Sequence, residues 1–359
     1  MPTGADLAQV AVLLTVLVVA VVLLAALARG RRRPRPAGAD ADPAEVVAEE
    51  LPWVAVVANP TKVDSVSARQ AWVAQVSARH GLGTPVWLET TVEDPGLGQA
   101  DTAVEIGAHA VLAYGGDGTV RSVASRLAGS AVPLGLLPSG TGNLLARNLG
   151  VPVNDLDAAL TVALTGQDRK IDVGRLALGL PGQPDLPPRR EAFLVMAGLG
   201  FDAEVMASVE PRLKKHVGWW AYVVAGARLL RGQQIKITIE MDGAPIIHRR
   251  VRSAIVGNCG ELIAGLRLLP DARPDDGWLD VVTVAPRGVV GWAAVVAEVL
   301  SGSRRGHPIV ERFRCRQVSI RAEKPLPVQV DGDPGGIAQT MSADLEPLGL
   351  VVRAPDPMP

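Results

Sequence analysis

The sequence predicts an α/β domain with a parallel sheet flanked by helices, followed by a β-rich sandwich domain. Two observations carry this prediction. Up to about residue 165, short apolar runs alternate with segments of helical periodicity, which is typical of a parallel sheet covered by helices. Beyond that point, strand-like runs follow one another across turn residues, which favours antiparallel pairing. We therefore expect domains over residues 51–165 and 166–352, with the last strand free to return to the first domain.

The first predicted domain contains four strands and four helices in alternation. Its strands are apolar runs of strand length, and its helices have apolar residues at helical spacing. The expected strands cover residues 53–58, 85–89, 110–113 and 133–137, and the expected helices cover residues 65–80, 98–108, 120–127 and 144–149. In such sheets, ligands bind at the carboxyl ends of the strands, so the loops after these strands are the candidate site.

The second predicted domain is read from β-branched residues and partial two-residue alternation. Expected strands cover residues 170–178, 191–197, 234–241, 249–256, 279–284, 313–321 and 327–330. A helical segment over residues 201–231 interrupts them. It contains basic residues followed by Trp219 and Trp220, a combination that suits an anionic bilayer surface and equally a solvated helix start with two core tryptophans.

Residues 7–28 predict a transmembrane helix, because only Gln9 and Thr15 interrupt an apolar run of about twenty residues, the length needed to span a bilayer. Five arginines follow between residues 29 and 35, which favours a single-pass membrane protein with the rest of the chain in the cytoplasm. Residues 29–50 are expected to form a basic, proline-rich flexible linker. A cleaved signal peptide and a buried soluble helix remain alternatives.

Composition limits the function classes. The chain of 359 residues has 36 Lys and Arg, 37 Asp and Glu and a net charge of −1, so no basic field favours nucleic acid as a partner. The two cysteines give neither a disulfide framework nor a metal-ligand spacing, and the five histidines are scattered. A homodimer is left open.

Two glycine-bearing loops are the strongest chemical signal. Each follows a predicted strand and precedes a predicted helix, where backbone amides and the helix dipole favour a bulky anion. The loops contain Gly115, Gly116, Asp117, Gly118 and Thr119, and then Gly140, Thr141 and Asn143. The acidic Asp117 suits a phosphate that carries Mg²⁺, or a hydroxyl that must lose a proton. The loops therefore predict nucleotide-dependent phosphoryl transfer.

Four further motifs occur in a fixed order around these loops: Asn59-Pro60, the run AGLGFD at 197–202, DGWLDV at 276–281 and VDGDP at 330–334. With them, the chain from about residue 53 to residue 352 resembles the diacylglycerol kinase catalytic-domain family, in particular the bacterial soluble-type lipid kinases. The resemblance implies an α/β nucleotide domain and a β-sandwich domain with the active site between them. It also implies a diacylglycerol-like lipid substrate taken from a bilayer.

The resemblance assigns roles to individual residues. ATP is expected along residues 115–121 and at Asn59, Pro60, Thr61, Lys62, Thr91, Gly140, Thr141 and Asn143. Asp117 is expected to support Mg²⁺ and the phosphates, and Asp333 to accept the proton of the lipid hydroxyl. A second cation is expected at the Asp276 carboxylate and the carbonyls of Leu279 and Val281, since hard cations take such oxygen ligands.

The sequence departs from the family pattern at three places. Asp333 stands where the family usually has Glu, Leu144 stands where it often has Asp, and residues 59–65 lack the usual glycines. Sphingoid-base and ceramide kinases also lack the acid at the position of Leu144. The alternatives are therefore a sphingoid-base or ceramide-type kinase, an NAD kinase-like enzyme, and a non-enzymatic, membrane-bound nucleotide or lipid sensor.

Overall fold

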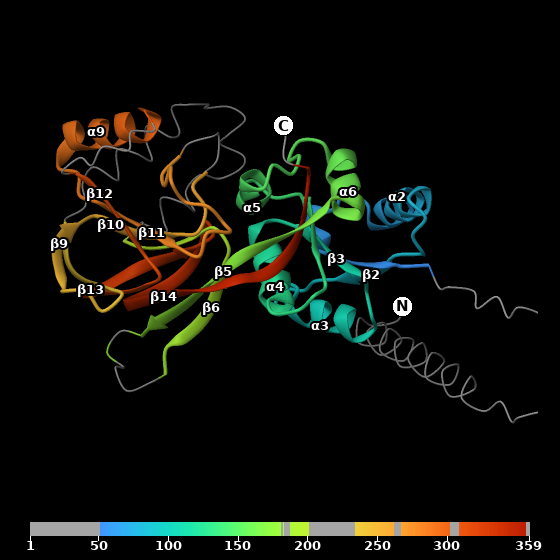
Figure 1. The fold of residues 1–359 in the computed structure, drawn as a ribbon, viewed down its shortest axis with the longest axis horizontal. Coiled ribbons are helices and arrows are strands. Elements are labelled where there is room, and N and C mark those ends of the chain that lie inside the picture. The colour runs from blue at the N-terminus through green and yellow to red at the C-terminus, as the bar shows by residue number, and fades with distance from the viewer. Residues whose placement is uncertain are drawn as a thin grey trace, which may run out of the picture. The chain divides into compact units, whose positions relative to one another are not determined.

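The computed structural model describes residues 51–180, 182, 187–200, 234–261, 267–301 and 309–356. The segment predicted as helical over residues 201–231, with its two neighbouring tryptophans, lies outside these residues. The α/β part and the β-rich part are both present in the described residues, as the sequence predicted (Figure 1).

The expected single-pass membrane protein is corrected. Throughout the described ranges, no helix combines the length and the apolarity needed to cross a bilayer. The prediction depended on residues 7–28, and these residues lie outside the described part of the chain together with the expected linker over 29–50. A bilayer span needs one continuous apolar helix of sufficient length, and the residues that the structure describes contain none.

The α/β part is built on parallel strands in the order β4-β3-β1-β2. These are β1 (Val54–Ala58), β2 (Val86–Glu89), β3 (Ala110–Gly115) and β4 (Leu134–Pro138). Every residue of β1, β3 and β4 is buried, because helices cover both faces of the sheet. Figure 1 shows α3 (Leu97–Glu105) and α4 (Asp117–Leu127) on one face, and α2 (Val66–Arg79) and α6 (Leu156–Thr165) on the other.

Side-chain caps mark where two of these helices, α6 and α2, begin. The Asp155 carboxylate accepts a hydrogen bond from the Ala158 amide at 3.0 Å, which starts α6. The Ser65 hydroxyl accepts a hydrogen bond from the Ala68 amide at 3.5 Å, at the start of α2. A short helix, α5 (Leu144–Asn148), follows the second glycine loop, and a 3₁₀ turn, η1 (Pro60–Lys62), follows β1.

The β-rich part consists of antiparallel strands and one further helix, α9 (Gly288–Ser301). Its strands are β5 (Gln167–Gly179), β6 (Arg189–Phe193), β7 (Met196–Leu199), β8 (Ile235–Met241), β9 (Ile247–Val251), β10 (Ser253–Gly257), β11 (Leu279–Val284), β12 (Val310–Cys315), β13 (Gln317–Val330) and β14 (Asp333–Ala354). Three runs predicted as single strands are each divided between two strands. The chain turns within them, at residues 194–195, 252 and 316, and alternation alone does not mark such a bend.

Strand β14 belongs to both parts of the fold. Its residues from Asp333 to Asp344 pair antiparallel with β13, and those from Thr340 onward pair with β5. Near its end, Val352 pairs parallel with Leu134 of β4. One continuous hydrogen-bonded network therefore joins the parallel sheet to the β-rich part (Figure 1).

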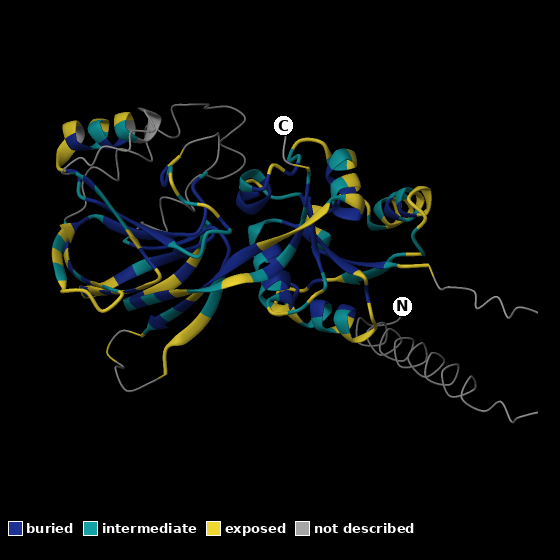
Figure 2. Cartoon of the chain, viewed as in Figure 1, coloured by how far each residue is buried: buried dark blue, intermediate teal, exposed yellow. Residues whose placement is uncertain are grey.

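Two buried hydrophobic clusters stabilise the described fold. One surrounds the parallel sheet and includes Leu112 and Leu136, and the other fills the β-rich part and includes Phe193 and Ile320. Figure 2 shows the parallel strands β1, β3 and β4 buried, whereas β13 and β14 have buried residues between exposed or half-buried ones. Packing is close enough that a Cβ on Gly174 would lie 2.3 Å from the Phe193 ring.

Asp280 of β11 is a carboxylate within this core. The residue is 9% exposed, and its Oδ2 has no hydrogen-bond partner among the described residues. Burial raises the pKa of Asp280 from 3.8 to about 6; Asp276 and Asp271 add to the rise, and Arg314 opposes it. Because the folded state disfavours the ionised form, the stability associated with the neutral acid is complete below pH 3.8 and is lost as the pH rises through about 6.

We therefore expect Asp280→Asn to stabilise the protein at neutral pH, by roughly 1 to 3 kcal/mol in the free energy of unfolding, because Asn carries no charge to bury. The gain should shrink toward pH 4, where the native Asp280 is already neutral. Urea unfolding at pH 7.5 and pH 4, with a chelator present, measures both values. Asp344→Asn on the exposed face of β14 is the control. An equal gain at both pH values would contradict the prediction.

Candidate functional site

The two glycine loops lie against each other at the ends of neighbouring strands. The Ser139 amide donates a hydrogen bond to the Gly115 carbonyl at 3.0 Å. A Cβ on Gly140 would lie only 2.7 Å from the Gly116 Cα, so a larger residue could not be placed there without moving the loops. The glycines that predicted an anion site therefore also allow the two loops to meet.

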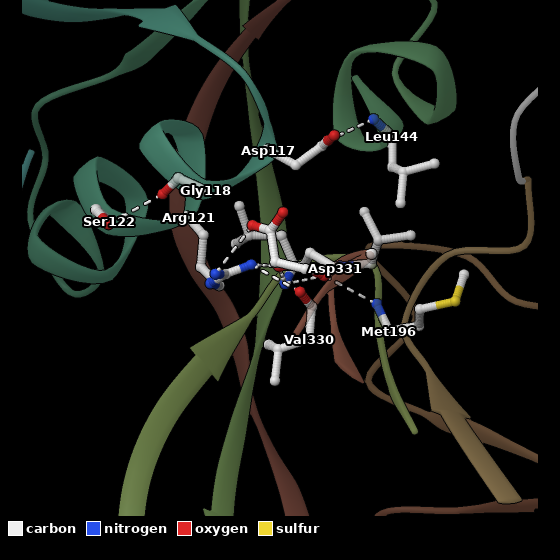
Figure 3. A network of polar contacts seen from close by, with 12 residues as sticks. Asp117, Gly118, Arg121, Ser122, Leu144, Met196, Val330 and Asp331 are labelled. Atoms are coloured by element: carbon white, nitrogen blue, oxygen red, sulfur yellow. Dashed lines mark hydrogen bonds and ion pairs between the residues drawn. The ribbon is translucent and has the colours of Figure 1, made fainter. Parts of the chain in front are cut away.

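Asp117 ties the first loop to the second. It is the first residue of α4, and its two carboxylate oxygens accept hydrogen bonds from the amides of Asn143 at 2.8 Å and Leu144 at 2.6 Å. Figure 3 shows the bond to Leu144. A Cβ on Gly142 would lie 2.5 Å from the Asp117 Oδ2, so this glycine is needed for the contact.

The environment of Asp117 raises the pKa of its carboxyl group. Burial raises its pKa from 3.8 to about 6, and the negative charges of Asp331 and Asp333 add to the rise. The amides of Leu144 and Asn143 oppose it. The carboxylate is therefore a group whose charge would be stabilised by a cation, as well as a structural link between the loops.

Asn143 shapes the second loop. It adopts a left-handed conformation with a φ of 48°, and its side-chain amide both accepts from the Gly140 amide and donates to the Gly140 carbonyl, each at 2.9 Å. Arg147 Nε donates to the Gly142 carbonyl at 2.8 Å. Thr141 lies exposed within the loop that these bonds hold.

The segment after β1 lies beside the end of β3. The Asn59 amide donates to the Tyr114 carbonyl at 2.9 Å, one residue before the first glycine loop. The Asn59 side chain accepts hydrogen bonds from the Thr61 amide at 3.0 Å and the Thr61 hydroxyl at 2.7 Å, which starts η1 with Pro60 as its first residue. Lys62 ends η1 and is exposed.

Thr91 follows β2, next to β1 in the sheet. Its hydroxyl accepts a hydrogen bond from the Asp94 amide at 3.0 Å, and its own amide donates to the Asp94 carbonyl at 2.9 Å. The side chain is exposed, and its hydroxyl serves a turn that leads into α3. The predicted residues of the α/β part therefore lie at the carboxyl edge of the sheet.

The turn between β13 and β14 is held by a buried carboxylate. Asp331 is 3% exposed, has a φ of 49°, and accepts hydrogen bonds from the amides of Leu194 at 3.0 Å, Val195 at 2.8 Å and Met196 at 3.0 Å. Burial raises its pKa, and Arg121 is the largest opposing influence. The role of Asp331 in the structure is therefore to fix the shape and position of this turn.

Arg121 joins α4 to the same turn. One terminal nitrogen donates to the Val330 carbonyl at 2.8 Å and lies 3.8 Å from the Asp331 carboxylate; the other lies 3.2 Å from the Asp333 Oδ2. Figure 3 shows the guanidinium of Arg121 directed at Val330 and Asp331. From the sequence, Arg121 was expected only at the end of an ATP-binding stretch, because a contact over more than 200 residues has no local signal.

Asp333 is thereby brought against the first glycine loop. A Cβ on Gly118 would lie 3.0 Å from its Oδ2, the oxygen that is paired with Arg121. Among the described residues, none donates a hydrogen bond to its Oδ1, and the side chain is 47% exposed. Asp117, Gly118 and Asp333 thus come together from segments more than 200 residues apart in the sequence.

The residues expected to bind a second cation lie at the start of β11 and in the turn before it. The Asp276 carboxylate accepts a hydrogen bond from the Trp278 amide at 3.1 Å and is paired with Arg314. Leu279 and Val281 are buried within β11. Nowhere in the described residues do three acidic, histidine or cysteine side chains gather as metal ligands. A cation site made of one carboxylate and two backbone carbonyls is a different arrangement, and it stays a prediction.

A surface hollow of about 500 Å³ lies elsewhere, over β8, β9 and β13. Its lining includes Lys236, His248, Arg250 and Arg321, and it contains none of the predicted site residues. Several basic side chains line the hollow. The candidate site lies elsewhere, where the glycine loops and carboxylates come together around Asp117.

Comparisons with known proteins agree with the motifs and the fold. Residues 54–176 match the diacylglycerol kinase catalytic domain, and residues 195–353 match the YegS C-terminal NAD kinase beta sandwich-like domain. A protein named diacylglycerol kinase from Staphylococcus aureus (strain JH9) is 26% identical over 285 residues, which cover 78% of this chain and 86% of the relative.

Solved structures share the fold. A diacylglycerol kinase from Bacillus anthracis str. Sterne superposes with a TM-score of 0.65 at 19% identity, covering 86% of this chain and 98% of that one. A putative diacylglycerol kinase from the same organism gives a TM-score of 0.63 at 19% identity, with 86% and 99% coverage. The two matched domains together cover most of the chain, which therefore belongs to the diacylglycerol kinase catalytic-domain family, joined to a YegS-type C-terminal domain.

Proposed function

We propose that this protein is an ATP- and Mg²⁺-dependent lipid kinase that transfers the γ-phosphoryl group to a hydroxyl of diacylglycerol or a similar membrane lipid. The observation that carries the proposal is the position of Asp333. A half-exposed carboxylate with one free oxygen lies directly against a glycine loop at a helix N-terminus. Phosphoryl transfer to an alcohol is helped by a loop that binds the phosphates and by a nearby carboxylate that accepts the proton of the hydroxyl.

In this proposal the loops at the carboxyl edge of the sheet bind the nucleotide. The first turn of α4 offers backbone amides and the positive end of its dipole to the phosphates. Thr141 and Lys62 are exposed beside these loops and would add a hydroxyl and a positive charge. Asn59 and Thr91 shape the neighbouring turns, so their contribution would be to hold the backbone that meets ATP.

Mg²⁺, when bound with ATP, supplies positive charge that neutralises the phosphates during transfer. Asp117 suits a supporting role for that ion, since burial and neighbouring carboxylates disfavour its negative charge in the absence of a cation. Each of its oxygens accepts one backbone amide and retains further acceptor capacity. The same carboxylate fixes the second loop, so Asp117 would align both loops with the nucleotide.

Asp333 is the proposed general base. Its Oδ2 is held by Arg121, and its Oδ1 is free to accept the proton of the lipid hydroxyl. Aspartate is one methylene shorter than the glutamate usual in the family. Since Gly118 has no side chain, the Asp333 carboxylate can lie close to α4. We propose that this close approach compensates for the shorter side chain.

The acceptor is tested directly by incubating the purified full chain with ATP, Mg²⁺ and vesicles that contain diacylglycerol, ceramide or a sphingoid base, or with NAD in place of lipid. We expect phosphorylation of diacylglycerol or a related lipid and none of NAD, detected as labelled product from γ-labelled ATP. Phosphorylation of NAD alone would favour the NAD kinase-like alternative. Nucleotide binding without turnover of any acceptor would favour a sensor.

Replacing Asp333 with Asn should lower kcat for lipid phosphorylation by about 100-fold or more, since an amide cannot accept the proton. The KM for ATP should change little, because the nucleotide loops are left intact. Steady-state kinetics with saturating lipid measure both constants, with Asp344→Asn in the same strand as the matched control. Near-native kcat in the Asp333→Asn enzyme would exclude this residue as the base.

Replacing Asp117 with Asn should weaken ATP binding by about tenfold or more, because the amide nitrogen of Asn would face a backbone N–H that the carboxylate now accepts. Calorimetric titration with ATP and Mg²⁺ gives the dissociation constant. Asp101→Asn, which removes an exposed partner of Arg126, is the control and should leave it unchanged. Equal affinities for the two variants would contradict a role for Asp117 in aligning the loops.

A further inference from the structure

We propose that Arg121 is a positioning residue that sets the orientation of Asp333 and links it to the nucleotide loop. The inference rests on the proposed function, because it assigns Asp333 the role of base. It goes beyond that function because it assigns Arg121, on helix α4 of the α/β part, a role in orienting a base that lies at the start of β14.

The contacts of Arg121 span both parts of the molecule. The residue lies on α4, one helical turn after Asp117 and Gly118, and its side chain is 20% exposed. One terminal nitrogen donates to the Val330 carbonyl at 2.8 Å, and the other lies 3.2 Å from the Asp333 Oδ2. The helix that begins at the first glycine loop thus also holds the turn that carries the base.

The ion pair restricts Asp333 without blocking it. A side chain that is 47% exposed would otherwise sample several rotamers. With Oδ2 held by Arg121, the carboxylate presents Oδ1 in one direction, and that oxygen has no donor among the described residues. A correctly oriented base contributes strongly to rate, whereas a misplacement of about 1 Å can cost roughly 100-fold.

The planar fork of arginine is required for both contacts at once. Its two terminal nitrogens serve different acceptors, the Val330 carbonyl and the Asp333 carboxylate. Lysine would keep the positive charge but offers a single nitrogen, so it would hold one acceptor well and the other poorly. This difference predicts a graded series of variants.

The test compares Arg121→Gln and Arg121→Lys with Arg126→Gln. Arg126 lies on the same helix and pairs with Asp101 on the surface, so it controls for the loss of an α4 ion pair. We expect Arg121→Gln to lower kcat by about 10-fold to 100-fold. The KM for ATP should stay within about threefold of native. Arg121→Lys should give an intermediate kcat, and Arg126→Gln a native one.

A double-mutant comparison separates positioning from a general effect on the fold. If Arg121 acts through Asp333, adding Arg121→Gln to Asp333→Asn should lower kcat little further. Additive losses would overturn the inference, as would a kcat of Arg121→Gln equal to that of Arg126→Gln, or a loss confined to the KM for ATP. Near-ultraviolet circular dichroism of each variant checks folding. If Arg121→Gln unfolds, the kcat of Arg121→Lys, which keeps the charge, is compared with that of Arg126→Gln instead, and equal values would overturn the inference.

Failure of the proposed function gives a different result. If the native chain phosphorylated no lipid in the vesicle panel, the assignment of Asp333 as base would fall, and this inference with it. If the native chain is active and only the Arg121 variants behave like Arg126→Gln, the proposed function stands and the inference alone is wrong.

Discussion

The candidate site depends on the hydrogen bonds that the buried carboxylate of Asp331 accepts. Three backbone amides of residues 194–196 converge on it, so the turn after β13 has one position relative to the β-rich part. That position brings Val330 and Asp333 within reach of Arg121 on α4. Removing the Asp331 carboxylate would leave three buried amides unpaired and release the turn.

Local signals in the sequence predicted much of the architecture. The strands and helices of the α/β part follow from apolar periodicity, and the glycine loops were placed at strand ends by the same pattern. A last strand able to return to the first domain was expected, but the residue range of β14 was not predicted, because its glycines and prolines interrupt the alternation and its pairing partners are far away in the sequence. Helix α6 was missed as well. The membrane helix was predicted from an apolar run of spanning length and the arginines after it; the described residues contain no helix long and apolar enough to cross a bilayer, and residues 7–28 lie outside them.

The candidate site residues also differ in whether a local motif identifies them. The glycines and Asp117 were identifiable because they stand next to one another in the sequence. That Asp117 bonds the second loop, and that Arg121 bonds the turn at Asp333, depends on tertiary contacts that no sequence window contains. The second cation site was implied by the motif at residues 276–281 and stays a prediction. In the structure, the guanidinium of Arg314 from β12 pairs with the Asp276 carboxylate.

The paired strands β5 and β14 run from the parallel sheet into the β-rich part as one two-stranded ribbon (Figure 1). Proteins that open and close on a substrate commonly do so about a few unpaired hinge residues. In this chain, a swing of one half against the other would have to bend or twist that ribbon. The pairing of that ribbon is interrupted between Glu346 and Leu350, so a movement between the halves would act there or in the loops around the ribbon.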